Sequence, residues 1–185
     1  MDRLTLPYRV TCAEAWLPED AAAEPPMAPM PKKLPRRLSR LSRAVLSCVS
    51  RVAAAAGPQA LQYPVVYASR YGEIARTLAL FAEYEEYHEM SPAGFSVSVH
   101  NTPASLLGLA TANCNSSCTL AAGADSLRAA VLEAALLARS GPCLLVYGDE
   151  QQMDREAVSA VAAVIEHDTQ PRPLPESITE IMQMV

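Results

Sequence analysis

The side chains that could carry chemistry in this sequence are its cysteines and histidines. The cysteines are Cys12, Cys48, Cys114, Cys118 and Cys143. Their number is odd, their spacing is irregular and no Cys-x-x-Cys pair occurs, so the pattern predicts neither a disulfide framework nor a zinc site. We expect reduced thiols in a cytosolic protein, with no bound metal and no cofactor.

Cys118 is the first candidate nucleophile, because it shortly precedes a tight turn and a predicted helix. A catalytic thiol needs a lowered pKa, which a helix N-terminus or a cationic neighbour supplies. The turn is Ala121-Ala122-Gly123, so Cys118 should lie inside the preceding strand and not at the helix end. A buried, unreactive cysteine is the simpler prediction. A small independent thiol-dependent acyltransferase that uses Cys118 is the alternative.

The three histidines are scattered, and nothing in the sequence brings one toward Cys118 as a general base. They are His88, His100 and His167. His100 is expected in a loop and is the one that could touch a ligand. Gly72-Glu73 follows a predicted strand but lacks the further glycines of a dinucleotide or phosphate loop. The sequence therefore carries no cofactor signal.

Composition and charge limit the possible functions. The chain has 185 residues, of which 50% are hydrophobic and 19% are charged, as is typical of one globular domain. The net charge of −5 argues against a general nucleic-acid binder. The start has no apolar segment of a secretory signal, and no apolar run is long enough to span a membrane. We expect a cytoplasmic protein.

A basic run stands out in this acidic chain. It consists of Lys32, Lys33, Arg36, Arg37, Arg40 and Arg43. Positive charge at the start of a helix opposes the helix dipole, so the placement costs stability without an evident local gain. The run is either a solvated helix start or a docking site for an acidic partner.

Residues 113–150 are the stretch that must position Cys118. They predict a short strand, a tight turn, a nearly all-apolar helix and a second buried strand. A helix that is apolar on almost every side should be wrapped by the rest of the protein. Two strands joined by a helical crossover should be parallel neighbours in a sheet covered on both faces.

The remaining elements follow from periodicity and turn residues. Before residues 113–150 we expect an edge strand at residues 4–16, a Pro-rich loop at about 18–35, an amphipathic helix at 38–56 and a central strand at 63–69. A helix at 73–87, an alternating piece at 95–99 and a short helix at 103–110 should follow. Beyond residue 150, residues 158–165 favour a strand over a helix. A short tail at about 170–185 is Pro-rich, with a terminal helix that starts at Glu176 or Ser177. The alternation predicts an α/β layered domain.

Three segments together resemble the N-terminal half of the β-ketoacyl synthases, in the thiolase superfamily. They are PRRLSRLSRAVLSCVSRVAAAAG, SVSVHNTPASLLGLA and SSCTLAAGADSLRAAVLEAALLA, in this order. The resemblance covers about residues 34–166 and is closest to the short chain length factor type of aryl polyene and type II polyketide systems. It implies one ketosynthase-like N-terminal domain over residues 1–185, with a thiolase-like α/β fold and a mixed sheet around a buried central helix.

Departures from the family pattern imply that the chain is not itself an enzyme. The family's nucleophile turn reads Thr-Ala-Cys, then two residues, then Gly. Aligning Gly123 with that glycine places Leu120 in the nucleophile position. Active synthases also use two histidines, in His-Gly-Thr-Gly-Thr and Asn-Ser-Phe-Gly-Phe-Gly contexts, and this sequence contains neither motif. Nothing would then stabilise a thioester oxyanion.

The resemblance instead implies a role as a partner. In the family, the strand that leads into the nucleophile turn pairs with its twin across a two-fold axis. The corresponding residues here are Ser116, Ser117, Cys118, Thr119, Leu120 and Ala121. The chain would thus form a heterodimer with an active β-ketoacyl synthase. Half of a thiolase fold leaves apolar surface uncovered, which gives a physical reason for that partner.

Two further roles are implied by the same resemblance. Side chains at the interface would complete the acyl tunnel of the synthase; the candidates are Leu78, Phe81, Ala82 and Phe95. Acidic acyl carrier protein would dock on basic residues at the start of the first helix; the matching positions are Arg36, Arg37 and Arg40. The expected function is chain-length control in polyene, polyketide or fatty-acid-type elongation. A scaffold that only stabilises the synthase remains open.

Overall fold

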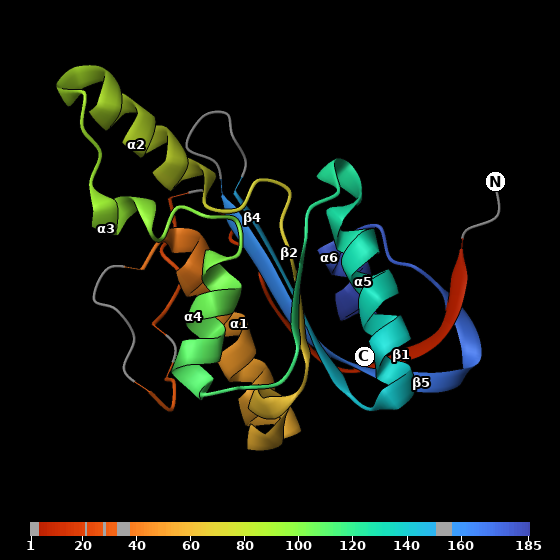
Figure 1. Ribbon diagram of the computed structural model, residues 1–185. Coiled ribbons are helices and arrows are strands. Elements are labelled where there is room, and N and C mark those ends of the chain that lie inside the picture. The colour runs from red at the N-terminus through yellow and green to blue at the C-terminus, as the bar shows by residue number, and fades with distance from the viewer. Residues whose placement is uncertain (1–3, 21, 28, 33–37, 151–156) are drawn as a thin grey trace.

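Strand β4 (Cys143–Glu150) lies at the middle of a five-stranded mixed sheet. The computed structural model describes residues 4–20, 22–27, 29–32, 38–150 and 157–185. The other strands are β1 (Thr5–Trp16), β2 (Val65–Ala68), β3 (Ser117–Leu120) and β5 (Val158–Pro173). Their spatial order is β1-β5-β4-β2-β3 (Figure 1). Strands β3, β2 and β4 run parallel, and β5 and β1 are antiparallel to their neighbours.

The sequence of β4 explains why the sheet is covered on both faces. All eight residues of the strand are buried. Since side chains alternate along a strand, Leu144 and Val146 point to one core, and Leu145 and Tyr147 point to the other. A run of β-branched and aliphatic residues without polar alternation is typical of such a doubly covered strand.

Helices form a layer on each face of the sheet (Figure 1). On one face lie α1 (Arg40–Ala56) and α4 (Thr102–Thr111), and on the other lie α5 (Ser126–Leu137) and α6 (Ile178–Met182). Helix α1 approaches β4 very closely at Gly148. A Cβ atom there would lie 2.9 Å from Leu41 Cδ1 and 2.7 Å from Val45 Cγ2. The glycine therefore sets the distance between this helix and the sheet.

Helices α2 (Ile74–Tyr87) and α3 (Pro92–Phe95) form an arm that stands away from the sheet, at the upper left of Figure 1. Leu80 is the one residue of α2 that is buried. A Cβ atom on Gly94 would lie 3.1 Å from Leu80 Cδ2, so the two helices pack through this pair. The arm thus has a small core of its own and a large exposed surface.

The structure confirms the predicted edge strand, the long first helix, the central strand, the helix of residues 73–87 and the strand character of residues 158–165. Helix α1 ends where Gly57, with a φ of 98°, precedes Pro58. The Ser177 hydroxyl accepts a hydrogen bond from Glu180 N and caps α6, as expected for the terminal helix. The mixed α/β sheet predicted from the resemblance is present.

The expectation that β3 and β4 are neighbours is wrong. Strand β2 lies between them and pairs with both in parallel, Val66 opposite Cys118 on one side and opposite Leu145 on the other. A helical crossover fixes the direction and hand of the second strand but not whether it skips a position. Short apolar β2 fits that buried central position.

Helix α5, the nearly all-apolar helix expected within residues 113–150, is not surrounded by the rest of the chain on every side. Its buried residues, such as Ala130 and Ala134, face the sheet, whereas Leu136 on the outer side is 46% exposed. The outer side, which also carries Arg128 and Glu133, is therefore a surface of this chain and not part of its core.

Two smaller predictions were also wrong. Residues 95–99, expected as an alternating piece, form the end of α3 and the turns after it, because Ser91 caps a helical turn by accepting a hydrogen bond from Gly94 N. The tail expected from about residue 170 begins inside β5, which extends to Pro173 since its last residues pair with β1.

The Pro-rich loop at 18–35 contains no helix or strand among its described residues, as predicted. It is nevertheless fastened to α1. Arg40 Nη2 donates to Ala23 O at 2.7 Å, Arg43 Nη1 lies 3.0 Å from Glu24 Oε2, and Ser50 Oγ donates to Pro29 O at 3.0 Å. These contacts give the basic side chains of α1 a local structural role.

Candidate functional site

The carboxyl ends of β3, β2 and β4 meet at one edge of the sheet, the place where parallel α/β sheets carry their sites. Strand β3 ends at Leu120, β2 is followed by Ser69, and β4 ends at Glu150. Ser69 N donates to Leu120 O at 3.3 Å, so the ends of β2 and β3 are joined. The candidate site is built from these three ends and from the starts of α1 and α2.

The turn after β3 is closed by Ser126, the first residue of α5. Its buried hydroxyl accepts from Ala122 N at 3.0 Å and donates to Gly123 O at 2.8 Å. Gly123 has a φ of 56°, a left-handed conformation that glycine adopts without strain. The chain thus makes the sharp strand-to-helix turn on which enzymes present a nucleophile.

No residue of this turn carries a nucleophilic atom. Leu120 is the last residue of β3 and packs against the core under α5. The residue with the left-handed backbone is Gly123, three positions later, and a Cβ atom there would meet no other atom within 4 Å. Whether the nucleophile position is assigned to Leu120 or to Gly123, the turn holds only aliphatic residues and glycine.

The thiols near the turn are poorly suited to catalysis. Cys118 lies inside β3 and is half-buried. Burial raises the pKa of its thiol, and the nearby Glu133 carboxylate adds to the rise. Burial also raises the pKa of Cys143 to about 12. Both thiols are therefore neutral near pH 7, and a neutral thiol is a weak nucleophile.

The histidines lie in three different places. His88 follows the exposed end of α2, and His167 lies in β5 opposite Tyr8. His100 belongs to the loop before α4, and its Nε2 lies 2.9 Å from Ser69 O. His100 also packs against Gly72, where a Cβ atom would lie 2.9 Å from His100 Cδ2. It therefore holds the end of β2, and among the described contacts none joins a histidine to Cys118.

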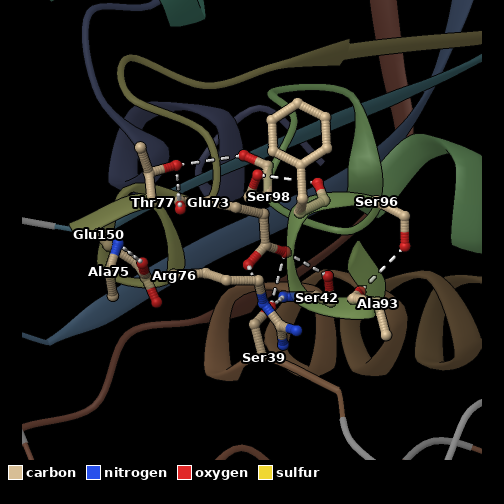
Figure 2. A network of polar contacts seen from close by, with 11 residues as sticks. Ser39, Ser42, Glu73, Ala75, Arg76, Thr77, Ala93, Ser96, Ser98 and Glu150 are labelled. Atoms are coloured by element: carbon tan, nitrogen blue, oxygen red, sulfur yellow. Dashed lines mark hydrogen bonds and ion pairs between the residues drawn. The ribbon is translucent and has the colours of Figure 1, made fainter. Parts of the chain in front are cut away.

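A buried carboxylate, Glu73, occupies the centre of the site (Figure 2). Its Oε1 accepts hydrogen bonds from Ser39 Oγ at 2.7 Å and from Ser42 Oγ at 2.6 Å. Its Oε2 lies 3.9 Å from Arg76 Nε. Thr77 continues the network, because its hydroxyl lies 3.1 Å from Glu73 O and 3.3 Å from Ser98 O. The start of α2 is thereby joined to α1 and to the loop after α3.

Two further acidic residues close β4. Asp149 accepts from Ser69 Oγ and from Tyr147 Oη, each at 3.3 Å, and its Oδ2 lies 3.7 Å from Arg70 Nε. Glu150 Oε2 accepts from Ala75 N in the first turn of α2 at 3.4 Å. Burial raises the pKa of both carboxyl groups above their ordinary values, against the opposing effect of these hydrogen bonds.

These carboxylates supply charge that the helices lack. Neither α1 nor α2 has an acidic residue in its first turn. Glu73 places a carboxylate at the start of α1, and Glu150 places one at the start of α2. Because negative charge at a helix N-terminus is favourable, each contact stabilises its helix, and the Glu73 contact offsets the cost that the basic residues at the start of α1 would otherwise carry. The cluster fastens helices together.

The cluster has no geometry for a metal. Among the described residues, no group of three or more histidine, cysteine, aspartate or glutamate side chains is arranged to hold an ion.

No helix in the described part of the chain is long and apolar enough to cross a membrane.

Sequence comparison identifies the fold's relatives. Residues 10–166 match the family model of the β-ketoacyl synthase N-terminal domain. The chain belongs to this family. No curated protein matches the sequence.

Solved ketosynthases share the fold. One similar structure is a ketosynthase (ApeO) in complex with its chain length factor (ApeC) from Xenorhabdus doucetiae, with 22% identity and a TM-score of 0.71 over 98% of this chain and 90% of that chain. Another is a β-ketoacyl synthase from Burkholderia phymatum STM815, with 15% identity and a TM-score of 0.60 over 77% of this chain. The ishigamide ketosynthase/chain length factor has 14% identity and a TM-score of 0.54 over 71% of this chain.

The shares of the matched chains differ in an informative way. The alignments take in 46% of the Burkholderia phymatum chain and 43% of the ishigamide chain, so this chain spans less than half of each. In the ApeO–ApeC complex the alignment takes in nearly all of a chain of similar length. A ketosynthase-like chain of this size is therefore found in that complex.

The predicted interface residues of this ketosynthase-like chain form an open edge. Strand β3, with Ser116 before it and Ala121 after it, pairs with β2 and with no other described strand. Ser117 is exposed, and Cys118 and Thr119 are half-buried. The predicted tunnel residues lie elsewhere, on the α2–α3 arm. Leu78, Phe81 and Phe95 are 50%, 58% and 59% exposed, and Ala82 is exposed beside them.

The predicted carrier-docking residues are only partly placed. Arg36 and Arg37 lie outside the described residues. Arg40 begins α1, and its side chain contacts Ala23 O and, at 3.5 Å, Glu24 Oε1. It therefore also serves to hold the Pro-rich loop.

Sequence reasoning missed the carboxylate cluster. The available signal was charge at the end of one apolar strand, in Asp149 and Glu150, and charge a few residues after another, in Glu73. Charged residues are almost never fully buried unless they are paired.

Proposed function

We propose that this chain is a non-catalytic, chain length factor-type subunit that forms a heterodimer with an active β-ketoacyl synthase. The observation that carries the proposal is strand β3, an unpaired edge that leads directly into a nucleophile turn without a nucleophile. A turn kept in shape by Ser126 but lacking a reactive atom serves structure and not catalysis.

The two sheet edges differ in a way that supports pairing through β3. Edge strand β1 carries Pro7, which lacks an N–H group, and two register shifts, at Pro7/Tyr8 and Val10/Cys12. Such features discourage a further strand from pairing. Strand β3 has no proline, no charge and no bulge against β2. Its backbone groups are ready to extend the sheet into a second protein.

Backbone geometry identifies which groups of β3 would make the seam. Ser116 O accepts a hydrogen bond from Val65 N in β2, and Leu120 O accepts one from Ser69 N just after β2. Since backbone groups alternate between the two sides of a strand, the N–H groups of Ser117 and Thr119 face the open edge. In the proposed heterodimer they bond to the synthase, and Ser116 to Ala121 form the interface.

The same proposal gives roles to the exposed arm and to the basic residues. Leu78, Phe81, Ala82 and Phe95 are apolar and exposed, as is required of side chains that would close the far end of the partner's acyl tunnel. Arg36, Arg37 and Arg40 would dock the acidic acyl carrier protein beside α1. The elongated product is of the polyene, polyketide or fatty-acid type.

Co-expression with an active β-ketoacyl synthase from the same genome tests the proposal. We expect a 1:1 complex that condenses carrier-bound acyl groups, whereas the chain alone does not. Thr119→Pro, which removes an outward N–H group, should abolish the complex, and Thr119→Val, which keeps that group, should preserve it. Leu120→Ala should leave condensation intact. A chain that stays monomeric with every synthase, or that condenses alone, would refute the proposal.

Product analysis of the complex separates chain-length control from simple stabilisation. Phe81→Ala and Phe95→Ala should lengthen the product distribution if these rings close the tunnel. An unchanged product length in a stable complex would leave a purely scaffolding role. Arg36→Glu with Arg37→Glu should raise the KM for acyl carrier protein without dissociating the subunits.

A further inference from the structure

The outward face of α2 changes character along its length. Ile74, Leu78, Phe81 and Glu85 follow one another at steps of four, three and four residues within α2, and Glu89 lies just beyond the helix, after its C-cap residue His88. Residues at this spacing share one face of a helix. Thr77 borders this face and contacts Ser98, whereas Leu80, on another side of the helix, contacts α3. The outward face is thus apolar near the sheet and acidic toward the tip of the arm.

The root of α2 is fixed while its outer face is open. Glu150 caps the first turn, and Glu73 joins it to Ser42 of α1 and to Ser39, the N-cap residue of that helix (Figure 2). Leu78 is 50% exposed and Phe81 is 58% exposed, and Glu85 and Glu89 are exposed as well. A rigidly held helix with anchors at i, i+4 and i+7 is the form in which helices enter grooves of other proteins.

The charge at the tip is unfavourable within this chain. Glu83, Glu85 and Glu86 lie in the last turns of α2, Glu89 follows them, and the last turn contains no basic residue. Negative charge at a helix C-terminus opposes the dipole. Among the described residues, none of the four glutamates has an ion pair with a cation. The charge becomes favourable only against a basic surface.

We propose that α2 docks by this face into a groove of the synthase subunit that is apolar at its floor and basic at its outer rim. This inference rests on the proposed function and specifies the surface of the partner. Ile74, Leu78 and Phe81 fill the floor, and Glu85, together with Glu89 just beyond the end of the helix, pairs with lysine or arginine at the rim. Acyl carrier protein does not occupy this face, because two acidic surfaces repel each other.

Two charge-reversal pairs at the C-terminal end of α2 give a matched test. Glu85→Lys with Glu89→Lys changes the acidic end of the outward face and the residue just beyond the helix, and Glu83→Lys with Glu86→Lys makes the same change in net charge on other sides of α2. Both pairs add positive charge near the helix C-terminus, which favours the helix. Differences between them therefore report on the face and not on folding, which circular dichroism checks.

The readout is the Kd of the purified chain for the active synthase with which the wild-type chain forms a complex. We expect the Glu85/Glu89 pair to weaken binding by roughly ten-fold at low salt, with a smaller difference at high salt, and the Glu83/Glu86 pair to change it by less than about two-fold. Equal effects of the two pairs, or a difference that salt does not reduce, would overturn this inference while leaving the heterodimer intact. Absence of any wild-type complex would instead refute the proposed function.

Discussion

The hydroxyl of Ser42, in the first turn of α1, donates a 2.6 Å hydrogen bond to the buried carboxylate of Glu73 at the start of α2. Residues 31 positions apart in the sequence are thereby joined at the carboxyl edge of the sheet. The contact makes the orientation of the α2–α3 arm depend on α1. It also couples the arm to the basic start of α1.

Replacing Glu73 by alanine should destabilise the fold. The change leaves the Ser39 and Ser42 hydroxyls without their acceptor and removes the anion at the start of α1, at a cost of about 2–3 kcal/mol. Glu73→Gln keeps an acceptor oxygen and should cost about 1 kcal/mol. Denaturant midpoints measure both. The exposed Glu85→Gln should stay within about 0.5 kcal/mol of the wild type; equal losses for Glu73 and Glu85 variants would contradict the assigned role.

Removal of the Ser126 hydroxyl should loosen the turn after β3. Ser126→Ala takes away the acceptor of Ala122 N and the donor to Gly123 O, which should cost about 1–2 kcal/mol. The Ala122 amide should exchange its hydrogen faster than in the wild type, as NMR can show. Ser105→Ala, at an exposed position of α4, is the matched control. Unchanged protection of Ala122 would show that Ser126 does not hold the turn.

Asp149 and Asp168 should affect stability with opposite dependence on pH. Burial raises the pKa of Asp149, so its stabilising contribution is complete below its ordinary value of 3.8 and is lost as the pH rises through the folded-state pKa. Hydrogen bonds from Gln170 N and Thr169 N lower the pKa of Asp168, so its contribution is present above 3.8 and is lost as the pH falls.

Unfolding experiments between pH 3 and pH 7 check this contrast. Relative to the wild type, Asp149→Asn should become more stable as the pH rises, and Asp168→Asn should become less stable. If the stability differences of both variants from the wild type changed in the same direction with pH, burial at the end of β4 would not govern the pKa of Asp149.

Iodoacetamide should label a thiol placed in the turn after β3 faster than Cys118 inside β3. In a Cys114→Ser background, Gly123→Cys places a thiol where no atom lies within 4 Å of the new Cβ, at the start of η2 (Gly123–Asp125) before α5. It should react near pH 7 roughly ten-fold faster than Cys118, whose pKa burial raises. Peptide mass spectrometry gives both rates. Faster labelling of Cys118 would revive the alternative of a small thiol-dependent acyltransferase.

The sequence predicted the elements whose signals are local. The three- and four-residue spacing from Leu41 to Val52 specified α1, and Ser177 marked α6. The position of β2 between β3 and β4 could not be predicted, since strand order depends on which faces pack and not on any one segment. The same holds for Glu73, whose serine partners come from another helix.

Only the parts of the candidate site that depend on local sequence were predicted. Cys118 was expected inside a strand, and the Ala121-Ala122-Gly123 turn was found where the pattern placed it. The open edge of β3 follows from strand order and so became visible only in three dimensions. The outer side of α5 was expected to be buried, because a high content of apolar residues favours burial of a helix but does not show which of its sides are covered.

The asymmetry between β1 and β3 limits how far such a sheet can grow. A chain with two receptive edges could add strand to strand without end, as fibrous aggregates do. Here Pro7 and two irregularities make one margin unreceptive, and the short margin at Ser117–Leu120 is left open to a neighbour. Two molecules joined there would turn their unreceptive margins outward, so growth would stop at a pair. The fold thereby favours a closed assembly and discourages a polymer.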